Sequence, residues 1–193
     1  MNKKLLIGIG IAVILIILGV LLGKYIGYEK AVKDQSGDFA NLSSTNCQQL
    51  NTAETIKLGL DSQWKQRIES SKFLAGKTSK YNPSTEYTTY PGSLCVLNNE
   101  DSVVTYSHYY DIENPDGSLK GVYTKGVAHY DSRFNEIAVV GDLPCDIEVP
   151  PDATAPAEIL SVSNGIVHLS CPGYPESKSI DKVDFDLRNH TYR

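Results

Sequence analysis

Apolar and polar residues divide the chain into a long apolar run at the front, a short polar segment, and a region in which the two kinds alternate. Residues 5–22 contain only Leu, Ile, Val, Ala and Gly. A helix over this run would rise about 27 Å, close to the roughly 30 Å hydrocarbon core of a bilayer. Tyr25, Tyr28 and Lys24 follow where membrane-interface residues are expected. The pattern predicts a transmembrane helix within a membrane anchor of residues 1–30.

A cleaved signal peptide is the alternative to a retained anchor. Its apolar region would be about 7–15 residues long and would end at a small-x-small cleavage site. The run here is longer, and it leads into Gly23 and Lys24 without an Ala-x-Ala pattern. We therefore expect a single-pass membrane protein. Lys3 and Lys4 favour a cytoplasmic N-terminus, but Lys24, Lys30 and Lys33 on the opposite flank weaken this bias. The cysteines beyond the anchor support the same orientation, with the remainder of the chain outside the cytoplasm.

Beyond the anchor, composition separates a stalk from a folded domain. Residues 31–46 are mostly small and polar, which is typical of a spacer. Residues 47–193 then carry the patterns of regular secondary structure. A proline-rich stretch at residues 149–157 marks a candidate boundary within this domain, because proline stiffens an extended connection.

One amphipathic helix is predicted near the start of the domain. Asn51 can cap it, and Glu54 three residues later completes a variant of the capping box. Apolar residues then recur at every fourth position, namely Ile56, Leu60, Trp64 and Ile68. Gly76 provides a natural C-terminal stop. We expect Trp64 to anchor this helix on a sheet; the alternative is that it stacks on a ligand.

A loop over residues 77–92 is expected to precede a meander of three strands. Residues 102–112 and 119–130 are rich in Val, Thr and Tyr, and a turn sequence separates them. A tight turn sets their register. The expected pairs are Tyr110 with Val122, His108 with Thr124, and Val104 with Ala128. The expected core face comprises Val104, Tyr106, Tyr110, Ile112, Val122, Ala128 and Tyr130. Residues 137–140 supply the third strand.

A second hairpin is predicted around Asn164-Gly165, a strong signal for a two-residue turn. The turn pairs the flanking strands so that one face is buried, comprising Val162, Val167, Leu160 and Leu169. Residues 180–187 form a last alternating strand. Five or six antiparallel strands and one packed helix predict an α+β domain, in which the meander and the hairpin are arranged like a small sandwich.

The cysteines support an oxidising compartment. All four lie beyond the anchor, and none forms a C-x-x-C pair of the kind that binds zinc. We expect the disulfides Cys47–Cys95 and Cys145–Cys171. Cys47 and Cys95 lie on either side of the helix and its loop, and Cys145 and Cys171 lie on either side of the proline-rich connection. Each bond would close a loop of roughly 25–50 residues. The alternative is four buried free thiols.

Charge narrows the classes of partner. Residues 31–193 carry 22 acidic against 14 basic side chains, a formal net charge of −8. An acidic domain repels phosphate backbones, so nucleic acid is not an expected partner. The same charge disfavours a peripheral grip on anionic lipid.

No pattern in the sequence predicts a catalytic, cofactor or metal site. There is no Gly-x-Ser-x-Gly and no glycine-rich phosphate loop. His108 and His129 fall on opposite faces of the predicted hairpin, so they cannot share a metal. Residues 111–117 resemble a calcium loop in part, but Ile112 and Tyr123 stand at two ligand positions. Calcium stays a minor alternative to solvated acidic faces, as with the carboxylates of Asp184 and Asp186.

Tyrosine is the one compositional excess, with 12 residues against four Phe. Tyr109 and Tyr123 pair on the face of the predicted hairpin opposite its core, flanked by Thr105, Lys125 and His129. An exposed tyrosine pair with polar neighbours suits a protein or glycan contact. The alternative is that a second sheet or the helix covers this face.

The predicted anchor offers a second candidate interface. Gly19, Gly23 and Gly27 are spaced by four residues and so lie near one helix face. Close backbone approach across small residues drives helix association in lipid. The alternative is that glycine is simply frequent in transmembrane helices.

Together these patterns favour a membrane-tethered accessory or assembly subunit that binds another membrane or envelope protein. An enzyme is not expected, and no cofactor is implied. The alternative class is a tethered enzyme or a solute- or glycan-binding domain with a pocket that the sequence does not reveal.

Overall fold

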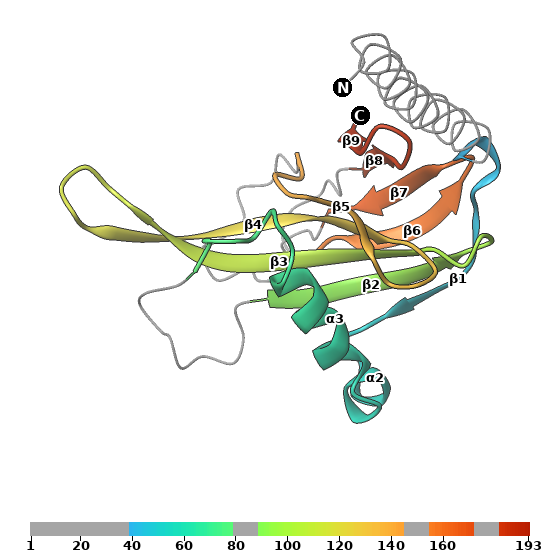
Figure 1. Cartoon of the computed structure of the whole chain (residues 1–193), viewed down its shortest axis with the longest axis horizontal. Coiled ribbons are helices and arrows are strands. Elements are labelled where there is room, and N and C mark those ends of the chain that lie inside the picture. Colours follow the sequence, from blue (N-terminus) through green and yellow to red (C-terminus); the bar gives the residue numbers. More distant parts are fainter. Residues whose placement is uncertain (1–38, 79–88, 145–154, 172–181) are drawn as a thin grey trace, which may run out of the picture. The chain divides into compact units, whose positions relative to one another are not determined.

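The computed structural model describes residues 39–78, 89–144, 155–171 and 182–193. The chain divides into the units Met1–Ala40 and Asn41–Arg193, and both sheets and both α-helices belong to the second unit. Within the described residues the protein is α+β and mostly antiparallel sheet, as predicted (Figure 1). No helix in these ranges is long and apolar enough to cross a bilayer. The predicted anchor lies outside them.

Five strands form the first sheet in the order of the chain. They are β1 (Ser44–Gln49), β2 (Thr89–Leu97), β3 (Ser102–Glu113), β4 (Leu119–Tyr130) and β5 (Glu136–Val140). All neighbouring strands are antiparallel. The predicted β3–β4 register is confirmed at each expected pair, Tyr110 with Val122, His108 with Thr124, and Val104 with Ala128. Gly117, in a positive-φ conformation, closes the turn between them.

Two strands of this sheet were missed by the sequence analysis. β1 begins at Ser44, so the last residues of the predicted stalk pair with β2. β2 runs through Pro91 and Gly92, which carry turn chemistry, and its pairing with β3 shifts between Pro91 and Leu94. A β-bulge therefore accommodates a sequence that is otherwise typical of a loop. A Cβ atom at Gly92 would lie 2.5 Å from the Cγ of Pro156, so only glycine fits there.

Four strands form the second sheet. They are β6 (Glu158–Ser163), β7 (Ile166–Ser170), β8 (Lys182–Asp186) and β9 (Thr191–Tyr192), in that order. The predicted two-residue turn is confirmed, with Asn164 at φ 52° and Gly165 at φ 74°. The expected pairing of Leu160 with Leu169 is wrong, because the register shifts between Ile159 and Ser161. Ile159 pairs with Leu169, and Leu160 is 49% exposed instead of buried.

The predicted single helix is two helices. After the short 3₁₀ helix η1 (Phe39–Asn41), α2 spans Ala53–Lys57 and α3 spans Leu60–Glu69. Gly59, at φ 73°, separates them and directs Ile56 outward, where it is 57% exposed. Thr52 and Thr55 form the capping box in place of Asn51 and Glu54. The helix also ends before Gly76, at Glu69.

The core lies between α3 and one face of the first sheet. Trp64 is a core anchor, as expected, and its ring packs 5.4 Å from that of Tyr130. The buried cluster also contains Leu50, Ile68, Leu74, Leu94, Val104, Tyr106, Ala128 and Val139. The even-numbered face of β3 therefore packs against the helix.

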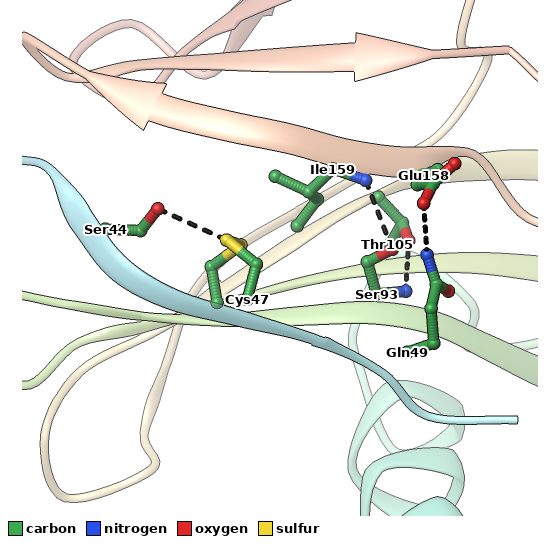
Figure 2. The surroundings of a disulfide bond; sticks show 8 residues. Ser44, Cys47, Gln49, Ser93, Thr105, Glu158 and Ile159 are labelled. Carbon is green, nitrogen blue, oxygen red and sulfur yellow. Dashed lines mark hydrogen bonds between the residues drawn. A yellow bond between two sulfur atoms is a disulfide. The ribbon is translucent and has the colours of Figure 1, made fainter. Parts of the chain in front are cut away.

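The other face of the first sheet packs against the second sheet. Polar bonds join the two sheets along β6, where Ser93 Oγ accepts from Ile159 N–H at 3.1 Å and Gln49 Nε2 donates to Glu158 Oε1 at 2.8 Å (Figure 2). Thr105 Oγ1 donates to the carbonyl of Ala157 at 2.6 Å. Because both faces of the first sheet are covered, its centre is buried on both sides.

Candidate interaction surface

The β3–β4 hairpin extends past its neighbours in the first sheet (Figure 1). β2 pairs with β3 only as far as His108, and β5 pairs with β4 only from Val127 onward. The five pairs from Tyr109–Tyr123 to Glu113–Leu119 therefore have no third strand beside them among the described residues. We call residues 109–113 and 119–123 the β3–β4 ribbon. The ribbon contacts the rest of the domain near residues 77 and 78. Asp111 N–H donates to Thr78 O at 3.3 Å, and Lys77 Nζ lies 5.3 Å from the centroid of the Tyr110 ring.

Tyr109 and Tyr123 form the aromatic pair that the sequence predicted. They are directly opposite in the register, and their rings pack with centroids 5.0 Å apart at an interplanar angle of 55°. Both side chains are half-buried. Any side chain at Gly121 would overlap the Tyr109 hydroxyl, so the ring of Tyr109 lies over this glycine. The pair is thus a fixed aromatic surface at the base of the ribbon.

The neighbours of this pair differ from the prediction. Thr105 and His129, expected to flank the tyrosines on an exposed face, have no exposed surface and lie under the second sheet. The side-chain nitrogen of Lys125 is also buried, and burial lowers the pKa of this lysine. The predicted alternative, a second sheet over this face, is correct at Thr105, which donates to Ala157 O, and at His129, which lies beside His190.

The predicted core face of the hairpin is correct only in its inner half. Val104, Tyr106, Ala128 and Tyr130 are buried against the helix, whereas Ile112 is 45% exposed. Two other members of the predicted face, Tyr110 and Val122, are only half-buried. The alternation of residues is the same in both halves, but the described helices and strands cover only the inner half. Ile112 lies on the surface of the ribbon.

His108 closes the inner end of the ribbon on the helix side. Its Nε2 donates to the carbonyl of Lys77 at 2.9 Å, which leaves Nδ1 to accept from Thr89 Oγ1 at 2.8 Å. This arrangement specifies a neutral ring, and burial lowers the pKa of His108. The ring also stacks on that of Tyr110, with centroids 6.2 Å apart. The first residues of the ribbon are thereby held to the body of the domain.

A second histidine lies between the two sheets. Nδ1 of His129 is 3.3 Å from Nε2 of His190, and its Nε2 is 3.4 Å from Asp101 Oδ2. These two groups form an ion pair only when the ring of His129 is protonated. Burial lowers the pKa of His129 to about 4, against the opposing effect of Asp101. His108 and His129 thus lie on opposite faces of the sheet, as predicted.

His168 joins two other polar side chains on the outer face of the second sheet. Its Nδ1 lies 2.7 Å from Asp184 Oδ1, and its Nε2 lies 3.0 Å from Ser163 Oγ. The two-residue turn predicted at Asn164-Gly165 implies that His168 pairs with Ser161, and the structure shows that pair. The turn does not by itself connect His168 with Ser163, which lies diagonally across the strand pair. The diagonal between adjacent strands was the signal that could have identified this group.

Carboxylates do not gather into a metal site in the part of the chain that the structure describes. No group of three or more His, Cys, Asp or Glu side chains in these ranges is arranged to hold a metal ion. In the calcium-like turn, Asp116 accepts from both the N–H and the Oγ of Ser118. Asp186 accepts from Arg188 N–H and pairs with Arg193. The described residues do not include three further carboxylates that lie near these in the sequence, Asp146, Glu148 and Asp181.

The predicted disulfide Cys47–Cys95 is confirmed, with Cα atoms 4.2 Å apart on the paired strands β1 and β2. Cys171 is also disulfide-bonded. Its predicted partner, Cys145, lies outside the described residues, and so do the candidate interface glycines Gly19 and Gly23. These pairings and contacts stay predictions.

Comparison with known proteins places the chain in no group. No family model matches the sequence, and neither a curated protein nor a solved structure matches it.

Proposed function

We propose that this protein is a membrane-tethered accessory or assembly subunit whose extracytoplasmic domain binds another membrane or envelope protein through the β3–β4 ribbon. The observation that carries the proposal is the extension of β3 and β4 beyond every neighbouring strand of the described sheet. A two-stranded ribbon is only marginally stable by itself in water. A partner that covers the ribbon would supply the burial that the helix and the second sheet give to the inner half.

The chemistry of the ribbon suits a protein contact. Paired tyrosines present large and rigid surfaces, and aromatic residues dominate the binding energy of many interfaces. Ile112 adds an apolar side chain near the tip. Charged residues of both signs surround these groups, namely Asp111, Glu113, Asp116 and Lys120. A partner surface with an apolar centre and a polar rim matches this arrangement.

The tether is the second part of the proposal, and it rests on the apolar run of residues 5–22. A retained anchor restricts the domain to the membrane surface, which raises the effective concentration of a membrane-bound partner. The chain should then stay in the pellet after carbonate extraction and retain its first residues. Recovery of a soluble chain that begins after Gly23 would contradict the tether.

Matched substitutions can test the role of the ribbon. Ile112 and Val96 are each 45% exposed, but Ile112 lies in the ribbon and Val96 lies in β2. The full-length protein, purified in mild detergent, should retain a specific partner that mass spectrometry identifies. We expect Ile112→Asp to reduce recovery of this partner at least tenfold, whereas Val96→Asp leaves it unchanged. Equal recovery with both variants would show that the ribbon is not the contact.

The predicted transmembrane helix offers a separate contact. We expect Gly19→Ile and Gly23→Ile to lower association with the partner, or with a second copy of the chain, in a membrane two-hybrid assay. Gly8→Ile is the control, because Gly8 lies far along the helix from the end of the glycine stripe. The same signal from all three variants would leave the helix as a tether alone, with binding confined to the domain.

A further inference from the structure

Three adjacent strands of the second sheet place a serine, a histidine and an aspartate in one chain of hydrogen bonds. Ser163 is the last residue of β6, His168 is central in β7, and Asp184 is central in β8. Asp184 is directly opposite His168 in the register, and Ser163 lies diagonally across from it. The distances are 3.0 Å from Ser163 Oγ to Nε2 and 2.7 Å from Nδ1 to Asp184 Oδ1.

The chemistry of the three groups specifies the direction of these bonds. A carboxylate can only accept, so Nδ1 of His168 carries the hydrogen and donates it to Asp184. In the neutral ring Nε2 is then the acceptor, and the hydroxyl of Ser163 donates to it. This is the hydrogen-bonding order of a serine nucleophile, its general base and the residue that orients the base.

The group is open to solvent on the face that the first sheet does not cover. The side chains of His168 and Asp184 are 37% and 47% exposed, and Ser163 is half-buried. The opposite face of the same strands carries the buried apolar residues Val162, Val167, Leu169, Val183 and Phe185. Those residues hold the strands in register, so the polar group stands on a rigid support.

We propose that Ser163 is a nucleophile with His168 as its general base, and that it reacts with carboxylic esters. Asp184 is a positioning residue that holds the tautomer and orientation of the imidazole. Esters are the substrate class because they expel an alkoxide or phenolate, which is a better leaving group than the amine of an amide. A serine that has a base but stands on an open surface therefore reacts with esters first.

The reaction balances with water as the second substrate. Ser163 Oγ bonds to the acyl carbon while its proton moves to His168 Nε2. The bond from the acyl carbon to the alcohol oxygen then breaks, and the proton passes from Nε2 to the departing oxygen. Water next attacks the acyl-serine and gives a proton to Nε2. The bond between the acyl carbon and Oγ breaks, the proton returns to Oγ, and the carboxylic acid leaves.

A fluorophosphonate probe on the full-length protein in detergent tests the nucleophile directly. Labelling followed by peptide mapping should place the phosphonate on Ser163. Ser161 is the matched control, because it is exposed on the same face and pairs directly with His168. We expect Ser163 to be labelled at least about tenfold faster than Ser161, since general-base assistance contributes that much or more. Ser163→Ala should remove the fast labelling and leave only the slow labelling of Ser161, and hydrolysis of p-nitrophenyl acetate should fall with it.

The remaining variants separate catalysis from support of the fold. His168→Ala and Asp184→Asn should each slow labelling of Ser163 at least tenfold while the thermal unfolding midpoint stays near that of the wild type. Asp184→Glu should recover part of the rate, because it restores a carboxylate acceptor. Labelling of Ser163 that is no faster than that of Ser161, or that is unaffected by His168→Ala, would overturn the proposal. Val96→Asp, which lies in neither this group nor the β3–β4 ribbon, should leave the labelling unchanged. The labelling needs no partner, so its outcome does not depend on partner binding.

Discussion

The inner and outer halves of the β3–β4 hairpin have similar sequences and different surroundings. Both halves alternate aromatic or β-branched residues with polar ones, and one continuous register joins them from Ser102–Tyr130 to Glu113–Leu119. In the inner half, α3 covers one face and the second sheet covers the other. In the outer half, the described neighbours end, and Ile112 is exposed. Strand formation is therefore encoded locally, whereas burial depends on what packs against the strand.

This difference also explains how one hairpin can serve stability and binding. Substitutions in the inner half remove contacts that the folded domain already makes. Substitutions of exposed residues in the ribbon, such as Ile112, remove contacts that we propose are made with a partner. The effects on unfolding and on partner recovery should therefore be separable along the same two strands.

The largest expected effect is on the inner half. Tyr106 has no exposed surface, and Tyr106→Ala should lower the free energy of unfolding by about 3–5 kcal/mol, the range for loss of a buried aromatic ring. Ile112→Ala in the ribbon, where the side chain is 45% exposed, should lower it by less than about 1 kcal/mol. Denaturant unfolding measures both values.

Tyr106→Phe is the control for the first of these variants. Among the described residues the buried hydroxyl of Tyr106 has no hydrogen-bond partner, and burial raises its pKa. Its removal should change the free energy of unfolding by less than about 1 kcal/mol, because no bond is lost. A loss equal to that of Tyr106→Ala would mean that the hydroxyl, and not the ring, stabilises the inner half.

The disulfide Cys47–Cys95 should have the next largest effect. It joins residues 48 apart in the chain, for which the loop-entropy model gives about 4 kcal/mol. The double variant Cys47→Ala, Cys95→Ala should therefore unfold at a lower denaturant concentration. Partner recovery should stay intact under native conditions, since the bond lies in β1 and β2, away from the ribbon. Lost recovery from a folded double variant would couple the two regions.

The pH dependence of stability should reflect His129, which lies between the two sheets. Its pKa is about 4 in the folded protein and near 6.5 when unfolded. Between these values the unfolded chain binds a proton that the folded one does not, so the free energy of unfolding falls as pH falls from about 6.5 to 4. The full difference is about 3 kcal/mol.

The variant His129→Gln isolates this contribution. Its free energy of unfolding, compared with that of the wild type at each pH, should show the wild type losing stability more steeply below pH 6.5. Carboxylates that titrate in the same range cancel in this comparison. Parallel curves for the two proteins would show that His129 is protonated as readily in the folded chain as in the unfolded one.

Much of the fold could be predicted because it depends on local signals. The β3–β4 register followed from one turn, and the hairpin at Asn164-Gly165 followed from another. The disulfide Cys47–Cys95 could be predicted because its two cysteines lie on either side of the predicted helix and its loop. The two capping threonines were harder to predict from the sequence, because several residues before α2 can cap a helix. The break at Gly59 was also hard to predict, because glycine can adopt both the helical and the left-handed conformation.

The features that were missed depend on contacts distant in the sequence. β2 carries Pro91 and Gly92, and it is a strand because β1 and β3 pair with it on either side and Pro156 packs against the glycine. The bulge that exposes Leu160 depends on the pairing of β6 with β7. The group around His168 spans three strands, so no window of sequence contains it. Residue spacing cannot reveal such sites until the topology is known.

The smallest expected effect concerns the ring contact in the ribbon. Tyr109 and Tyr123 are a cross-strand pair with centroids 5.0 Å apart, and such pairs are worth about 0.5–1.5 kcal/mol beyond the area that they bury. A double-mutant cycle of Tyr109→Ala and Tyr123→Ala should therefore give a coupling energy in this range in denaturant unfolding. Gly121→Ala should reduce the coupling, because its Cβ would displace the Tyr109 ring.

The same cycle repeated on partner recovery should give a larger coupling, since the partner would bind both rings as one surface. A zero coupling in unfolding would mean that the rings are independent, and a coupling no larger in recovery would place the partner's contact elsewhere on the ribbon.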